Sequence, residues 1–80
     1  MKAIVTVRLK PGVLDPQGVT IAKALASMGY TGVGGVRAGK VFELQLDNGD
    51  AEGARKKAEE IAHRLLANPV IETYTVELQP

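Results

Sequence analysis

Two proline-containing junctions, residues 9–18 and residues 65–72, constrain the layout of this chain more than any other feature. The first follows an alternating strand pattern and precedes a helix pattern. The second follows another helix pattern and precedes a final strand pattern. Pro16 is suited to the first position of a helix, where its missing N–H would be unpaired in any case. Pro69 stops the helix before it, because the residue preceding a proline disfavours the helical conformation.

The first strand is predicted over residues 2–10, where Ala3, Val5 and Val7 alternate with polar residues. Asp15 is then predicted to cap a helix that runs to about Met28. The apolar stripe of this helix is expected to be buried; it comprises Ile21, Leu25 and Met28, flanked by Val19 and Ala22. Gly29 suits a left-handed helix stop.

The middle of the chain changes to a period of two. Residues 33–36 are expected to form a glycine-loosened strand, and residues 37–40 a tight turn into a second strand near residues 42–46. A turn at Asn48-Gly49 follows, and Asp50 is predicted to cap the second helix. The buried stripe of that helix is expected to contain Ala54, Ala58, Ile61 and Leu65, widened by Ala51, Ala62 and Leu66. A last strand is expected over residues 71–78.

The resulting order is β-α-β-β-α-β in a single domain of residues 1–80. Strands separated by helices require crossovers, whereas the central pair can form a hairpin. We therefore predict the α+β class, a ferredoxin-like two-layer sandwich with an antiparallel sheet. An 80-residue domain without cysteine has a small core and no disulfides, so self-association to a homodimer or homotetramer is expected. No apolar run spans a bilayer and no signal-peptide block is present, so we expect a cytoplasmic chain without membrane contact.

The sequence contains no recognisable combination of nucleophile, base and metal-ligating residues. His63 is the sole histidine, and with Glu59 it lacks the further ligands that a metal requires. Residues 32–35 are glycine-rich but match no phosphate-binding motif. The three aromatic residues are too few for a nucleic-acid stacking surface. The first forty residues carry a net charge of +5 and the last forty −4, and we expect the two halves to interleave rather than to mark a nucleic-acid surface.

The chain closely resembles the PurS family, the small subunit of three-component phosphoribosylformylglycinamidine synthase. The resemblance runs from end to end and rests on residues 10, 13–18, 24–25, 29–30, 33, 36–37, 39–40, 43–44, 65–72 and 74.

This resemblance implies that the chain takes part in purine biosynthesis as an accessory subunit without catalytic residues. It implies two partners, a glutaminase subunit that releases ammonia and a large synthetase subunit that uses ATP and Mg²⁺. The chain would bridge them, assist ammonia transfer and bind no cofactor itself. We take as candidate partner-binding residues Lys10, Asp15, Arg37, Lys40, Asn68 and Glu72. The alternative is an ACT-like regulatory module, which shares the topology and binds small molecules; Pro11-Gly12 is a faint sign of its ligand-binding turn.

Overall fold

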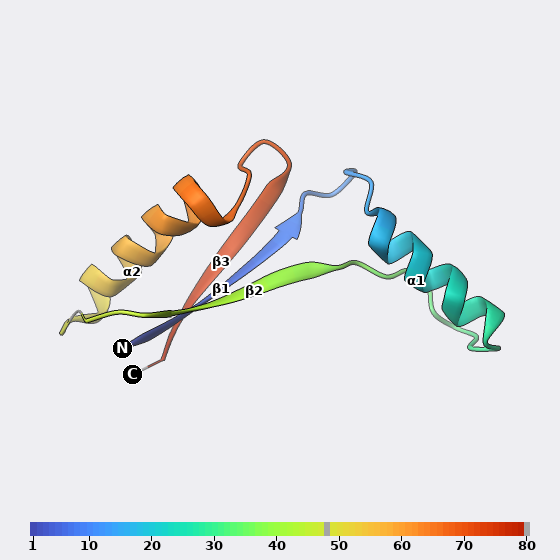
Figure 1. Ribbon diagram of the computed structural model, residues 1–80, viewed down its shortest axis with the longest axis horizontal. Helices are drawn as coiled ribbons and strands as arrows, with labels where there is room; N and C mark the ends of the chain where they lie inside the picture. The colour runs from blue at the N-terminus through green and yellow to red at the C-terminus, as the bar shows by residue number, and fades with distance from the viewer. Residues whose placement is uncertain (48, 80) are drawn as a thin grey trace.

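The structure is a computed structural model that describes residues 1–47 and 49–79. Its regular elements follow one another as β1 (Lys2–Leu9), α1 (Pro16–Ser27), β2 (Gly39–Gln45), α2 (Ala51–Ile61), η1 (Ala62–Leu66) and β3 (Glu72–Gln79), where η1 is one turn of π-helix (Figure 1). The predicted α+β class with an antiparallel sheet is confirmed. In the described part of the chain, no helix has the length and apolar character needed to cross a bilayer.

The sheet has the order β2-β1-β3, and β1 pairs antiparallel with both neighbours. The alternation predicted for β1 is observed: Ala3, Val5 and Val7 are fully buried beneath α2, and the residues between them point to the opposite face. This opposite face is not covered by either helix in the described residues (Figure 1). We call it the open face.

α2 contacts the sheet through small residues spaced one helical turn apart. Ala54 and Ala58 of α2 and Ala62, the first residue of η1, are all fully buried, and their short side chains let the helix backbone approach the sheet closely. Asp50 caps the helix as predicted, accepting a hydrogen bond of 2.7 Å from the Gly53 amide. The preceding turn was predicted at Asn48-Gly49, and Asn48 lies outside the described residues.

The end of α2 widens into η1, and this change separates two adjacent leucines into one that faces the core and one that faces away from it. The Ala67 amide donates to the Ala62 carbonyl, five residues back, over 2.9 Å. This wider turn carries Leu66 towards the core, where it packs against Val5 and Val7, and leaves Leu65 79% exposed. The prediction that Leu65 belongs to the buried stripe was therefore wrong, because it assumed a continuous period of 3.6 residues.

The η1 geometry predicts different costs for two adjacent leucine truncations. Leu65→Ala should change the free energy of unfolding by less than about 0.5 kcal/mol, as for other surface substitutions. Leu66→Ala should cost about 1–2 kcal/mol, since it removes a half-buried side chain from the core. Urea denaturation of the two variants measures both costs. A larger loss for Leu65→Ala would show that the helix continues with regular α geometry.

α1 begins and ends as predicted but lies away from the sheet. Asp15 caps it, Pro16 occupies its first turn, and Gly29 follows it with a φ of 88°. Its expected burial was wrong: Ile21 is exposed, and Met28 is 70% exposed. Figure 1 shows α1 beyond the end of the sheet rather than packed on it. The radius of gyration of 16.0 Å agrees with this extended shape, since a compact domain of this length has about 12 Å.

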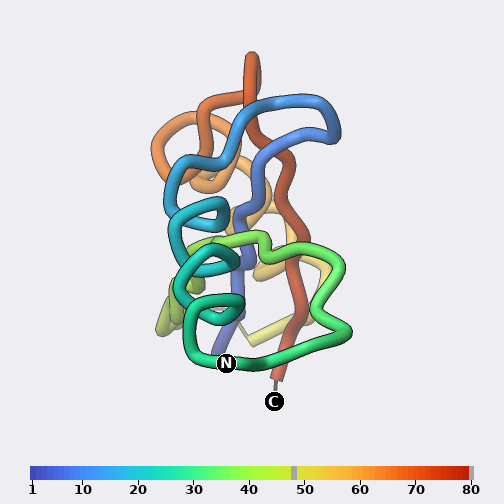
Figure 2. The backbone as a smooth tube through the Cα atoms, turned by 90° about the vertical axis from the view of Figure 1, so that its right-hand side faces the viewer, coloured from blue at the N-terminus to red at the C-terminus, as the bar shows by residue number. Residues whose placement is uncertain are grey.

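The segment between α1 and β2 is not a strand. Residues 30–38 contain no regular element, so the strand expected at residues 33–36 and the tight turn expected at residues 37–40 were both wrong. Gly39 and Lys40 instead begin β2, where Gly39 pairs with Arg8 of β1. The glycines in this segment supply no side chains to hold it against the sheet, and Gly32 adopts a φ of 83° that favours glycine. The segment returns beside α1 (Figure 2).

Candidate functional site

Three connecting segments meet at the end of the sheet that lies nearest to α1. They are residues 10–15 between β1 and α1, residues 30–38 between α1 and β2, and residues 67–71 before β3. The Lys10 amide joins the first to the third by donating to the Ile71 carbonyl over 2.8 Å. Figure 2 shows these two segments side by side. We call this meeting point the loop junction, and all six candidate residues from the sequence lie in it or at its edge.

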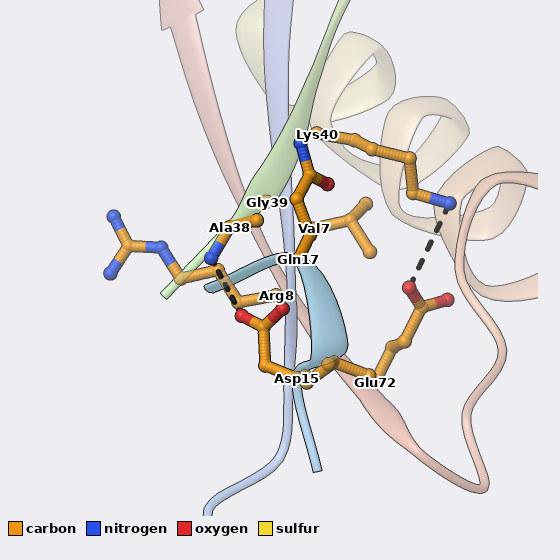
Figure 3. Close-up of a pocket in the computed structure, with 9 residues that line it drawn as sticks. Val7, Arg8, Asp15, Gln17, Ala38, Gly39, Lys40 and Glu72 are labelled. Atoms are coloured by element: carbon orange, nitrogen blue, oxygen red, sulfur yellow. Dashed lines mark hydrogen bonds and ion pairs between the residues drawn. The ribbon is translucent and has the colours of Figure 1, made fainter. Parts of the chain in front are cut away.

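Asp15 connects α1 to the entry of β2. Its side chain is only 5% exposed. Oδ1 accepts a hydrogen bond of 2.9 Å from the Gly18 amide, and Oδ2 accepts one of 2.7 Å from the Ala38 amide (Figure 3). These two bonds hold the pKa of the Asp15 carboxyl below its usual value; burial opposes the shift, and the positive charge of Arg37 supports it. One carboxylate therefore serves as helix cap and as a link to another segment.

Arg37 makes the complementary connection in the opposite direction. Its Nη1 donates to the Val13 carbonyl over 3.2 Å, and its Nη2 donates to the Lys10 carbonyl over 3.3 Å. The side chain of Asp15 thus binds the backbone beside Arg37, while the side chain of Arg37 binds the backbone before Asp15. We call this reciprocal pair of contacts the cross-link; it ties residues 10–15 to residues 37–38.

Lys40, Glu72 and Asn68 form a second polar group at the edge of the junction. Lys40 Nζ lies 3.7 Å from Glu72 Oε2. Glu72 Oε1 accepts a hydrogen bond of 2.7 Å from the Asn68 amide, and Asn68 Oδ1 accepts one of 3.0 Å from the Val70 amide. Because the Lys40 side chain is more than half exposed, the ion pair contributes less than about 1 kcal/mol. Its main effect is to orient the Glu72 carboxylate, which holds the turn before β3.

A small hollow of about 200 Å³ lies between these two groups on the side that faces α2. Its polar and charged lining residues are Arg8, Asp15, Gln17, Lys40 and Glu72. Figure 3 shows Asp15 directed at the backbone of Ala38, and Lys40 directed across the hollow at Glu72. The Asp15 carboxylate is used by two backbone amides, and the Glu72 carboxylate by Lys40 and an amide. The arrangement therefore suits recognition and loop ordering rather than acid–base chemistry.

The groups with catalytic or metal-binding potential lie elsewhere. His63 is exposed on η1, with its ring centroid 6.5 Å from that of Tyr74. Among residues 1–47 and 49–79, no three His, Cys, Asp or Glu side chains gather in a group that could hold a metal ion.

Sequence reasoning did not identify two contributors to the junction. The first is the amide of Ala38, because a backbone donor leaves no mark on residue type. The second is Gly18, which is buried where the Val36 carbonyl approaches its Cα so closely that a Cβ could not fit. The sequence did contain a hint of the role of Gly18. Glycine in the first turn of a helix lowers helix stability, so its presence there indicates that another part of the backbone approaches closely.

The second hydrogen bond of Asp15 distinguishes it from the other aspartate cap, Asp50. Asparagine caps helices about as well as aspartate, but its side chain offers only one acceptor oxygen and would turn an amide towards the second donor. Asp15→Asn should therefore lower the melting temperature by roughly 5 °C or more. Asp50→Asn, whose parent makes one cap bond, should shift it by less than about 2 °C. Thermal melts followed by circular dichroism give both values, and equal shifts would contradict the link to Ala38.

The same contact predicts a dependence of stability on pH. The pKa of Asp15 is lower in the folded than in the unfolded chain, so its contribution is complete above the unfolded value of about 4. The contribution is lost as the pH falls through the folded value, because protonation removes the acceptor charge. Asp15→Asn should lose less stability than the wild type between pH 5 and the acid range. If the free energy of unfolding of both proteins falls by the same amount over this pH range, this assignment is contradicted.

The chain is similar to known proteins both in sequence and in structure. The model of a family described as PurS, phosphoribosylformylglycinamidine (FGAM) synthase, matches residues 2–80. The phosphoribosylformylglycinamidine synthase subunit PurS of Mycobacterium leprae is 48% identical over 77 residues, covering 94% of this chain and 91% of that protein. The same subunit of Bacillus subtilis is 44% identical over 78 residues, covering 98% and 92%.

Solved structures agree with the sequence matches. The crystal structure of Methanocaldococcus jannaschii PurS has a TM-score of 0.88 with 37% identity, covering 98% of this chain and 94% of that one. A chain in the structure of PurLQS from Thermotoga maritima has a TM-score of 0.87 with 32% identity, covering 95% and 93%. The described fold, including the displaced α1, therefore has experimental counterparts over nearly its full length.

Proposed function

Since the chain belongs to the PurS family and is the small subunit of phosphoribosylformylglycinamidine synthase, an enzyme of purine biosynthesis, we propose that it acts there as a non-catalytic adaptor. In this proposal it contacts the glutaminase subunit and the large synthetase subunit together. Its task is to hold them so that ammonia passes from one to the other. We also propose that it works in the cytoplasm, where ATP and glutamine are available.

The chemistry of ammonia transfer explains why an adaptor without catalytic side chains is useful. Glutamine hydrolysis releases ammonia, and in water near neutral pH ammonia is largely protonated, which removes its nucleophilic lone pair. A protein contact that excludes water at the junction of two subunits keeps the nucleophile available. ATP and Mg²⁺ belong to the large subunit in this proposal, and the adaptor supplies surface rather than reactive groups.

The observation that carries the adaptor proposal is the position of α1. Most of its large apolar side chains are exposed in the isolated chain, although a helix packed on the sheet would bury its apolar stripe. The exposed members on and around α1 are Leu14, Val19, Ile21, Met28, Tyr30 and Val33. An exposed apolar surface of this kind is characteristic of a protein interface. The cross-link between Asp15 and Arg37 holds this surface away from the sheet, where another chain can reach it.

The ACT-like alternative is not favoured. Such a module needs a ligand-binding turn between the first strand and the first helix. Here Gly12 does adopt a left-handed φ of 87°. The carbonyls of Lys10 and Val13 that flank it, however, accept hydrogen bonds from Arg37. The turn is used to fasten the segment before β2.

We further propose that part of the exposed surface of α1 is covered by a second copy of the chain, in a homodimer or homotetramer. Ile21→Asp should then shift the mass measured by light scattering towards the monomer, because a carboxylate cannot be buried unpaired. Thr20→Asp is the matched control, since it adds the same charge on the polar side of α1 near its N-terminus. A monomeric wild type at micromolar concentration would contradict self-association.

Reconstitution of the enzyme tests the adaptor role itself. Glutamine-dependent synthesis by the glutaminase and synthetase subunits should require this chain. Synthesis supported by a high concentration of ammonium salt should depend on it far less, because no ammonia has to cross between subunits. Omission of the chain followed by measurement of both rates gives the comparison. Efficient glutamine-dependent synthesis without the chain would rule out the adaptor role.

A further inference from the structure

The open face of the sheet carries a cationic hollow at its junction end. Arg8 points to this face, because its neighbours Val7 and Leu9 point to the side that α2 covers. A hollow of about 390 Å³ is lined by Arg8, Arg37 and Lys40 together with Thr6, Ala38, Gly39 and Val41. Gly39 pairs directly with Arg8 across the two strands. Its missing side chain opens the space, since a Cβ there would lie 3.4 Å from the Arg8 Cγ.

No carboxylate lines this hollow. In the described part of the chain Arg8 has no ion pair and no side-chain hydrogen bond, although it is exposed on the central strand. Arg37 donates only to two neutral carbonyls. Asp15, which lines the neighbouring hollow together with Arg8, has both oxygens engaged by backbone amides. Two guanidinium groups therefore share one concave surface without a compensating anion.

The positively charged neighbour of Arg37 differs from the one expected from the sequence. The expected turn at residues 37–40 placed Lys40 beside Arg37. The Lys40 side chain lies on the face that carries Val7, where it reaches Glu72. Figure 3 shows Arg8 and Lys40 directed away from each other across β1 and β2. The positive partner of Arg37 on the open face is therefore Arg8, which sequence reasoning did not select.

From this geometry we infer that the hollow is a docking point for an acidic side chain of a partner subunit. The inference rests on the proposed adaptor function. Arginine binds carboxylates through two parallel hydrogen bonds. Arg37 is already held in place by its hydrogen bonds to the carbonyls of Lys10 and Val13, so its guanidinium needs little ordering on binding. Arg8 adds a guanidinium that has no competing partner in the described residues.

The surroundings of the hollow fit a protein ligand. Val41 is 64% exposed beside it, and the neighbouring residues of β3 on the same face are the uncharged Thr73 and Thr75. Arginine is enriched at the centre of protein interfaces, where surrounding residues that exclude water strengthen its contacts. The proposal therefore commits to an aspartate or glutamate of the glutaminase or the synthetase subunit.

Charge reversal of Arg8 tests the docking point in the assembled enzyme. Arg8→Glu should weaken the affinity of the chain for its partner subunits at least tenfold, measured by surface plasmon resonance with the other two subunits. Wild-type affinity should fall as salt is added, and the variant should show a weaker dependence. Lys57→Glu is the matched control, because it makes the same charge change on α2 and should leave the affinity within about twofold. The melting temperatures of both variants should remain close to that of the wild type.

The other outcomes each decide against the docking point. Wild-type affinity in Arg8→Glu would overturn it while leaving the adaptor function intact, and equal losses in both variants would reduce it to an effect of net charge. Titration of the chain with inorganic phosphate and ADP, followed by NMR at the Gly39 amide, completes the test. Saturable binding that Arg8→Glu abolishes, with assembly unchanged, would make the hollow a small-anion site. Failure of the wild-type chain to assemble would overturn both proposals.

Discussion

The carboxylate of Asp15 is the contact on which the rest of the arrangement depends. It accepts hydrogen bonds from the Gly18 amide at the start of α1 and from the Ala38 amide just before β2. Arg37 completes the connection by binding the backbone on the other side. Without these contacts α1 would be joined to the sheet only through two irregular segments. The cross-link therefore turns a loosely attached helix into a projecting element with a defined direction.

This arrangement changes how the exposed apolar surface of α1 is understood. In a compact monomer an exposed Met28 and Ile21 would be a liability for aggregation. In a subunit of a larger enzyme the same side chains provide a surface for another chain. The core is correspondingly small: β1 and α2 bury alanines and valines, and the largest fully buried side chains are Val5 and Val7. Association is a common route to stability for domains of this size.

The sequence predicted those features that local chemistry determines. The caps at Asp15 and Asp50, the stop at Gly29 and the buried face of β1 follow from neighbouring residues, and all were confirmed. The expected burial of α1 was wrong because its apolar stripe shows that the helix is amphipathic but not which molecule covers it. The prediction for residues 33–36 failed because glycine-rich segments carry no reliable period. Leu65 was misplaced because a π turn shifts every later side chain, and its signal is absent from the composition.

In the candidate site, too, features set by neighbouring residues could be predicted, whereas features set by tertiary contacts could not. Sequence reasoning selected six residues that the structure brings to one end of the sheet, since they lie at the junctions where the chain enters and leaves its elements. It could not show that Asp15 reaches the Ala38 amide, that Lys40 and Arg37 face opposite sides, or that Arg8 joins Arg37. These relations depend on strand register and on the path of residues 30–38, which arise only from the folded chain.

Amide hydrogen exchange at Ala38 and Gly18 measures the central contact most directly. Both amides should be protected at neutral pH, as the single carboxylate of Asp15 binds them both. Their protection factors should begin to fall together below the unfolded pKa of about 4 and be lost as the pH falls through the lower folded pKa, because protonation of that carboxyl weakens both hydrogen bonds. Free exchange at Ala38 with continued protection at Gly18 would contradict the account, since Asp15 would then be an ordinary helix cap and α1 would lack its attachment.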